Sequence, residues 1–196
     1  MPRLWGIFSL YIMVDLFNYT RRASSVAHIG ALDLGGDNPI RIQSMTTTNT
    51  NDTDACVRQA EEIIKAGGEL VRFTTQGSRE AENMKNINAG IRADGYQTPL
   101  VADVHFNPNV ADVAALYCEK VRVNPGNYVD PARKFIKQEY TDEEYAHELQ
   151  KIEERFVPFL NICKEHHTAI RIGVNHGSLS DRIRNRYGDT PEGIVE

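Results

Sequence analysis

The chain has 196 residues, which is long enough for one domain with its own hydrophobic core. Hydrophobic residues make up 41% and charged residues 25% of the sequence, as in an ordinary globular protein. The 22 basic and 27 acidic residues give a formal net charge of −5. Non-specific binding of nucleic acid needs a basic face, so this charge argues against a nucleic-acid partner.

The N-terminal part of the chain is predicted to lie outside the main fold. Residues 5–14 are apolar, but they are too few to span a membrane and no small-residue cleavage site follows them. We therefore predict that residues 1–12 are an N-terminal extension ahead of Met13, with a weak membrane anchor as the alternative and no membrane contact elsewhere. Within the N-terminal segment 13–38, residues 26–36 are typical of a β-hairpin, which could plug the bottom of a barrel.

From Pro39 onward, short apolar strands alternate with amphipathic helices, which is typical of a parallel (β/α) barrel. We expect strands at 39–42, 70–74, 100–104, 120–123 and 169–174, and helices from 53, at 78–93, from 108, at 143–166, at 180–187 and from 191. About five strands cannot close a barrel, since closure takes about eight. The prediction is an α/β fold, a partial TIM-type barrel over residues 39–196, with a helical insert at about 126–168 and the C-terminal part of the barrel missing.

Charged residues recur at one place in these strands. An arginine lies between apolar residues in four strands, and the remaining strand has an acid there: Arg41, Arg72, Asp103, Arg122 and Arg171. Alternate side chains of a strand point to opposite faces, so these charges face away from the aliphatic residues. An unpaired buried charge costs about 3–5 kcal/mol, so the arginines need anionic partners. Arginines that converge on one barrel mouth predict a multiply charged anionic ligand, and structural Arg–Asp pairs inside the barrel are the alternative.

Further polar residues follow the same strands. Asn124 and Asn175 come two and four residues after arginines, where their amides can donate to phosphate or hydroxyl oxygens. Asp103 is expected to accept from a ligand hydroxyl or to orient an arginine. His105 and His176 lie near the predicted mouth and are interpreted as hydrogen-bond fixtures rather than proton donors. No residue is assigned a catalytic role.

The three cysteines, Cys56, Cys118 and Cys163, are far apart and form no CxxC pair. Each falls on the apolar stripe of a predicted helix, which favours small buried side chains over metal ligands or disulfides. We therefore predict no metal site in this chain and a reducing compartment, the cytoplasm.

Four motifs in the chain carry a resemblance to a known family. They are PIRIQSMT at 39–46, VADVHF at 101–106, VRVNPGN at 121–127 and IRIGVNHGSL at 170–179. In this order they resemble 4-hydroxy-3-methylbut-2-enyl diphosphate synthase, and the resemblance covers about residues 13–196. The long insert is similar to the large-form enzymes of some bacteria.

The resemblance implies an activity in the methylerythritol phosphate route to isoprenoids. The family reductively opens the ring of 2-C-methyl-D-erythritol 2,4-cyclodiphosphate to give 4-hydroxy-3-methylbut-2-enyl diphosphate. Its barrel binds the substrate, so Arg72, Arg122 and Arg171 are expected to contact the diphosphate. Arg41 is a further candidate, with an internal pair with an acid as the alternative. Ferredoxin or flavodoxin supplies the electrons, and the full-length enzyme is a homodimer.

The family also carries a [4Fe-4S] cluster in a separate C-terminal domain, held by three cysteines and a glutamate. Cys56, Cys118 and Cys163 precede the region where the family keeps those ligands. The resemblance therefore implies that the iron–sulfur domain is absent from this chain, and that the chain is a substrate-binding barrel fragment that is inactive alone.

Two alternatives stay open. A pterin-binding barrel of the dihydropteroate synthase type shares the N-terminal hairpin and would use an Asp–Asn pair and a lysine. Only Asp103 and Asn124 support it. The other alternative is a non-catalytic barrel fragment that acts as an interaction module.

Overall fold

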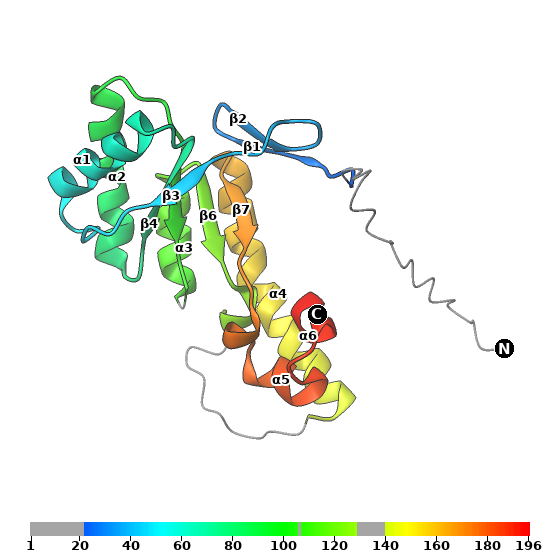
Figure 1. The fold of residues 1–196 in the computed structure, drawn as a ribbon. Helices are drawn as coiled ribbons and strands as arrows, with labels where there is room; N and C mark the ends of the chain where they lie inside the picture. Colours follow the sequence, from blue (N-terminus) through cyan, green and yellow to red (C-terminus); the bar gives the residue numbers. More distant parts are fainter. Residues whose placement is uncertain (1–21, 106, 129–139) are drawn as a thin grey trace.

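The computed structural model describes residues 22–105, 107–128 and 140–196. It contains a five-stranded parallel sheet, with neighbours in the order β3-β4-β5-β6-β7, and a separate two-stranded hairpin (Figure 1). The sheet strands are β3 (Gln43–Met45), β4 (Leu70–Thr74), β5 (Leu100–Asp103), β6 (Lys120–Val123) and β7 (Ala169–Ile172). Each strand pairs in parallel with the next. This is the open, partial TIM-type barrel that the sequence predicts, whereas the predicted extension 1–12 lies outside the described residues.

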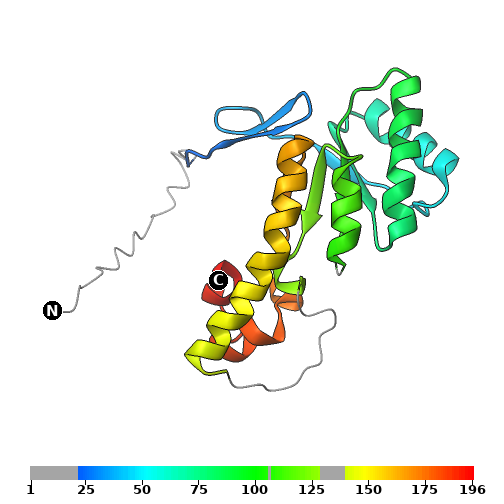
Figure 2. The ribbon, with the colours of Figure 1, turned by 180° about the vertical axis from the view of Figure 1, so that it is seen from behind.

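Helices cover the outer face of the sheet, as Figure 2 shows for α3 and α4. They are α1 (Thr53–Lys65), α2 (Ser78–Ala93), α3 (Pro108–Ala115) and α4 (Asp142–Glu165). The side chains of Asp52, Asn107 and Thr141 cap α1, α3 and α4 by accepting from backbone N–H groups of the first turn. Two short helices, α5 (Asp181–Tyr187) and α6 (Pro191–Val195), lie beyond the carboxyl end of β7 (Figure 1).

The hydrophobic core lies between the sheet and these helices. Strand residues such as Phe73 and Val121 are fully buried there against helix residues such as Met84, Ile91 and Phe159. Their neighbours along each strand point to the opposite, inner face, because side chains of a strand alternate. The core therefore fixes which face each charged strand residue occupies.

The hairpin is formed by β1 (Val26–Ile29) and β2 (Leu32–Gly35), which pair antiparallel. Ile29 is buried against Leu70 and Val101, at the amino ends of the sheet strands. This position agrees with the predicted plug at the bottom of the barrel. Apolar hairpin residues thus border the amino end of the inner face, while Asp103 and Arg122 lie toward the carboxyl ends of their strands.

The predicted first strand is wrong in position. Residues 39–42 lie outside the sheet, and β3 begins at Gln43. The physical reason is Arg41, which reaches sideways: its Nη1 donates to Glu69 Oε1 at 2.9 Å and its Nε to the Asp33 carbonyl at 2.9 Å. Arg41 therefore ties the hairpin to the start of β4, while Ile42 stays exposed.

Two further elements refine the predicted insert between the fourth and fifth sheet strands. A single 3₁₀ turn, η1 (Pro125–Asn127), follows β6, and α4 supplies the long helix with Pro158 inside it. Residues 129–139 of the insert lie outside the described residues.

We predict that the chain self-associates. Among the described residues, β3 and β7 each pair on one side only, and Ile172 on β7 is 54% exposed. Open strand edges invite pairing with another chain, so light scattering should show species larger than the monomer. Ile172→Lys should reduce this association because an edge lysine resists pairing, whereas Val195→Lys, at an exposed apolar residue of α6, should not. A stable monodisperse monomer would contradict the prediction.

Candidate anion-binding site

Three of the predicted site residues meet on the inner face of the sheet. Asp103 ends β5 and is 2% exposed, and its two carboxylate oxygens contact two arginines. Its Oδ2 lies 2.7 Å from Arg72 Nη2 on β4, and its Oδ1 accepts from Arg122 Nη1 on β6 at 3.2 Å. The alternation of each strand explains the meeting, because the flanking residues of all three are buried in the core on the other face.

Arg122 is the least exposed of the three arginines Arg72, Arg122 and Arg171. Besides Asp103, its guanidinium donates through Nη2 to the carbonyl oxygen of Gly173, just past β7, at 2.6 Å. The side chain is 11% exposed. Arg122 therefore bridges β5 and the end of β7 and leaves its remaining guanidinium donors at the carboxyl ends of the strands.

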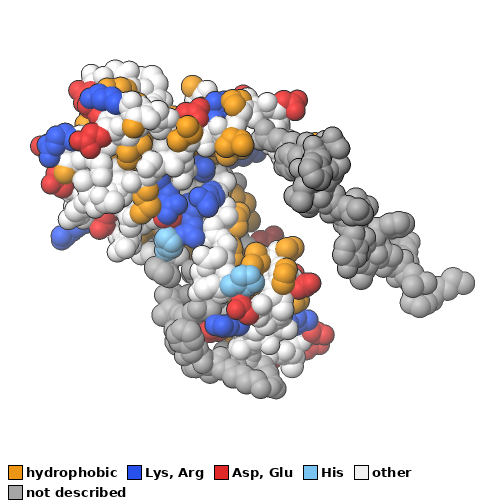
Figure 3. Space-filling model, viewed as in Figure 1, with side chains coloured by type: hydrophobic (Ala, Val, Ile, Leu, Met, Phe, Trp, Pro, Cys, Tyr) orange, Lys and Arg blue, Asp and Glu red, His pale blue; other side chains and the backbone are white. Residues whose placement is uncertain are grey.

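More positive charge adjoins this group. Arg171 on β7 pairs in register with Arg122 and is exposed, and Lys120 lies two residues before Arg122 on the same face of β6. Lys120 is buried, and burial, then Arg171 and Arg72, hold the pKa of its ammonium below the ordinary value. Two cations thus contact the Asp103 carboxylate and two more lie on the same face of the sheet. Figure 3 shows Lys and Arg side chains gathered beside a histidine at the middle of this face.

Lys120 is a residue that the motif reading missed. Its signal was present in the sequence, since Lys120, Val121, Arg122 and Val123 alternate charged and apolar residues. Such an excess of like charges in a partly buried place favours a bound anion, because the anion offsets their mutual repulsion.

His105 lies beside the carboxylate, with Nδ1 3.8 Å from Asp103 Oδ1. Burial first, and then the positive charge of Arg122, lower the pKa of its imidazole. The histidine is thus held neutral at pH values where an ordinary histidine begins to protonate. This position near the mouth agrees with the prediction, and its role as a fixture stays a prediction.

We predict that the pKa of His105, followed by NMR of the imidazole, lies below the ordinary value of about 6.5. Because the folded pKa is the lower one, the unfolded chain takes up the proton first, and this residue's contribution to stability is lost as the pH falls below about 6.5. Arg122→Ala should move the pKa of His105 upward, since one cationic neighbour is gone. A pKa that is unchanged in that variant would show that Arg122 does not face the imidazole.

The other predicted site residues occupy different places. Asn124 directly follows β6 and is buried: its Oδ1 accepts from Gly126 N at 3.2 Å and its Nδ2 donates to the Ser178 carbonyl at 3.0 Å. It thereby joins η1 to a second 3₁₀ turn, η2 (His176–Ser178). Asn175 is exposed directly before η2, so whether either amide meets a ligand stays a prediction.

Two candidates contact carboxylates away from Asp103 and its two arginines. His176 Nδ1 lies 2.7 Å from Asp189 Oδ1, and both side chains are half exposed, so its role as a hydrogen-bond fixture stays a prediction. Arg41, on the amino side of the strands, pairs with Glu69 and is not brought to the mouth. Glu69 is therefore the internal acidic partner that the sequence analysis allowed for Arg41.

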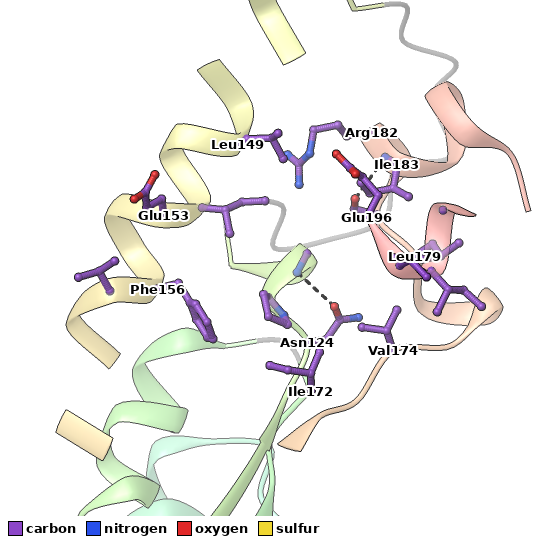
Figure 4. Close-up of a pocket in the computed structure, with 18 of the residues that line it drawn as sticks. Asn124, Leu149, Glu153, Phe156, Ile172, Val174, Leu179, Arg182, Ile183 and Glu196 are labelled. Carbon is purple, nitrogen blue, oxygen red and sulfur yellow. Dashed lines mark hydrogen bonds between the residues drawn. The ribbon is translucent and has the colours of Figure 1, made fainter. Parts of the chain in front are cut away.

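A separate cavity of about 470 Å³ lies next to the site, between α4, the end of β7 and the helices α5 and α6 (Figure 4). Its lining is mainly apolar, with Phe156, Ile172 and Leu179 among the residues drawn there. Arg182 lines it and is buried, with Nη1 3.7 Å from Glu148 Oε2. An apolar lining does not suit a multiply charged ligand, so the inner face of the sheet is the better candidate.

The cysteines do not fit an iron–sulfur cluster or a metal ion. All three are buried and free, and no group of three metal-binding side chains occurs among the described residues. Burial raises the pKa of all three thiols, that of Cys163 to about 12, whereas metal ligation needs the thiolate. Cys118 departs from prediction in one respect, because α3 ends at Ala115 and the cysteine lies in the turn that follows.

We predict that the purified chain takes up no iron–sulfur cluster under anaerobic reconstitution. The reason is the scatter of its thiols over α1, α4 and the turn after α3, each inside the hydrophobic core. An absorbance scan and an iron assay measure the outcome. A stoichiometric cluster would contradict the prediction.

The fold and these charged residues together define a class of protein, namely a partial (β/α) barrel with arginines and a lysine on the inner face of its sheet. No helix among the described residues is both long and apolar enough to cross a membrane.

The chain belongs to the GcpE family, since the GcpE TIM-barrel domain matches residues 24–196. It is 75% identical over 183 residues to 4-hydroxy-3-methylbut-2-en-1-yl diphosphate synthase (flavodoxin) of Phocaeicola vulgatus, an alignment that covers 93% of this chain and 30% of that protein. It is 74% identical to the protein of the same name from Bacteroides thetaiotaomicron, with the same coverage, and 53% identical over 180 residues to that of Akkermansia muciniphila, covering 92% of this chain and 31% of that protein. The chain thus spans about 30% of the length of these relatives.

Proposed function

We propose that this chain supplies the substrate-binding barrel of a 4-hydroxy-3-methylbut-2-enyl diphosphate synthase. The observation that carries the proposal is the convergence of Arg72 and Arg122 on Asp103, with Arg171 and Lys120 beside them. The substrate class would be a cyclic diphosphate, 2-C-methyl-D-erythritol 2,4-cyclodiphosphate. The names of the relatives support both the reaction product and flavodoxin as the electron donor.

In the whole protein, the reaction would open the ring reductively and eliminate water, and a [4Fe-4S] cluster would supply two electrons. The cysteines of this chain do not fit that cluster, so its ligands would come from a separate domain, with ferredoxin as the alternative donor. We also propose that the whole protein is a cytoplasmic homodimer and that this chain alone is inactive.

The chain's own residues would bind and orient the diphosphate. Guanidinium groups match phosphate oxygens with two parallel hydrogen bonds, and such charge-assisted bonds are the strong ones. Asp103 would hold Arg72 and Arg122 close together before the ligand arrives, because its carboxylate offsets part of their repulsion. It could also accept from a ligand hydroxyl, while Asn124 and Asn175 follow β6 and β7 directly before the 3₁₀ turns η1 and η2.

Calorimetric titration of the chain with the cyclodiphosphate tests this proposal. Wild type should bind it, and should not bind the uncharged polyol 2-C-methyl-D-erythritol. Arg72→Ala should weaken binding, whereas Arg155→Ala should not. Arg155 is a matched control. Its ion pair with Asp112 has a length of 2.6 Å, against 2.7 Å for the pair of Arg72 with Asp103, and its side chain is 27% exposed, against 26% for the side chain of Arg72.

Failure of wild type to bind the cyclodiphosphate would contradict the proposal. Binding of a pterin in its place would favour the dihydropteroate synthase type of barrel. Equal losses in Arg72→Ala and Arg155→Ala would show an effect on the fold rather than on the site.

A further inference from the structure

Gly173 is a buried residue directly after β7, and it is in contact with Arg122. Its N–H donates to the Val123 carbonyl at 2.8 Å, which continues the pairing of β6 with β7 beyond the strand. Its own carbonyl accepts from Arg122 Nη2 at 2.6 Å. The side chain of Arg122 therefore runs across the backbone at this position.

The close contact with Arg122 explains why position 173 needs a glycine. The described glycines with φ in the left-handed region are Gly30, Gly35, Gly36, Gly67, Gly95 and Gly188. Gly173 is not one of them, so no left-handed backbone conformation requires a glycine there. A Cβ built there, however, would overlap Nε of Arg122 and come within 2.7 Å of Cδ and Cζ. Real Cβ atoms do not approach heavy atoms so closely, so the arginine would have to move.

We propose that Gly173 is a positioning residue for the anion site. The missing side chain lets the Arg122 guanidinium lie against the end of β7, where it bonds both Asp103 and the Gly173 carbonyl. The proposal rests on the proposed function for the kind of ligand, and it adds a residue that binds through its effect on Arg122. Alanine at 173 would push the guanidinium off this place and would separate it from Asp103.

Titration calorimetry with inorganic pyrophosphate tests the proposal in this chain. Gly173→Ala should lower the affinity about 10- to 100-fold, the loss expected for one charge-assisted hydrogen bond. In an Arg122→Ala background, the same change at 173 should cost nothing further, because the overlapping atoms are gone. Gly193→Ala in α6 is the control glycine: a Cβ there comes no closer than 3.2 Å to its neighbours, and the affinity should stay that of wild type.

A second readout reports the position of Arg122 without any ligand. If Gly173→Ala displaces the guanidinium, the pKa of His105 should rise in this variant as it does in Arg122→Ala. A purely structural role of Gly173 would not couple the two positions in this way.

The outcomes test the positioning role of Gly173 separately from the proposed function. Unchanged affinity in Gly173→Ala, or the same loss in both backgrounds, would overturn the role of Gly173. If wild type does not bind pyrophosphate, the proposed function fails, and the His105 pKa alone decides the positioning role. If Gly173→Ala does not fold, the double variant Gly173→Ala/Arg122→Ala should fold, and its failure to do so would also overturn the proposal.

Discussion

Replacing Arg122 with alanine is expected to weaken binding of the cyclodiphosphate by about 1.5–3 kcal/mol, the range for hydrogen bonds to charged groups. Arg122 is the arginine with the least exposed side chain in the cluster, so its charge is screened least by water. It is also held in place at both ends of its guanidinium, by Asp103 and by the Gly173 carbonyl. A ligand that meets a preorganised guanidinium loses less conformational entropy on binding.

Arg122→Lys tests the contribution of the positive charge separately from that of the planar guanidinium group. An ammonium keeps the positive charge but cannot bond a phosphate with two parallel hydrogen bonds, so this variant should recover only part of the affinity. Calorimetric titration of wild type and both variants is the measurement, with thermal unfolding of each variant as a check on the fold. If Arg122→Ala bound the cyclodiphosphate with wild-type affinity, the arginines would form structural Arg–Asp pairs only, which is the alternative given in the sequence analysis.

Strand alternation made much of the site predictable. Once Val121 and Val123 are placed in the core, Arg122 must face the inner side, and the same argument places Arg72 and Asp103. Strand alternation does not distinguish arginines that bind an anionic ligand from arginines that form structural pairs with an aspartate. The structure contains features of both. Asp103 does form Arg–Asp pairs, and yet the cations on the same face of the sheet outnumber this one carboxylate.

The predicted position of the first strand was wrong because Arg41 bonds residues outside the sheet instead of lying on its inner face. The apolar–Arg–apolar pattern at 40–42 looks like a strand, but Arg41 bonds the hairpin and Glu69, and the strand starts later. Pattern reading has no access to such long-range partners. For the same reason it passed over Gly173, whose need for a missing side chain arises from contact with a residue 51 positions earlier.

Replacing Asp103 with alanine is expected to have the largest effect on stability among these site residues. The carboxylate is 2% exposed and is the shared partner of Arg72 and Arg122, so its removal leaves two neighbouring cations without it. Breaking a buried pair in this way costs about 3–5 kcal/mol, which is a large part of the total stability of an ordinary domain. Urea unfolding of wild type and variant measures the loss. Asp103→Asn should lose less than Asp103→Ala, because the amide oxygen still accepts a hydrogen bond.

Asp112→Ala is the matched control, since Asp112 pairs with Arg155 at 2.6 Å but is 26% exposed. An exposed pair contributes only about 0–1 kcal/mol, so this variant should unfold close to wild type. Pyrophosphate should restore part of the stability of Asp103→Ala, because a bound anion supplies the negative charge that the cations have lost and binds the folded state alone. It should leave Asp112→Ala no more stabilised than wild type. If the two alanine variants lost the same stability, or if pyrophosphate did not favour Asp103→Ala, the cluster around Asp103 would not be the anion site of this barrel.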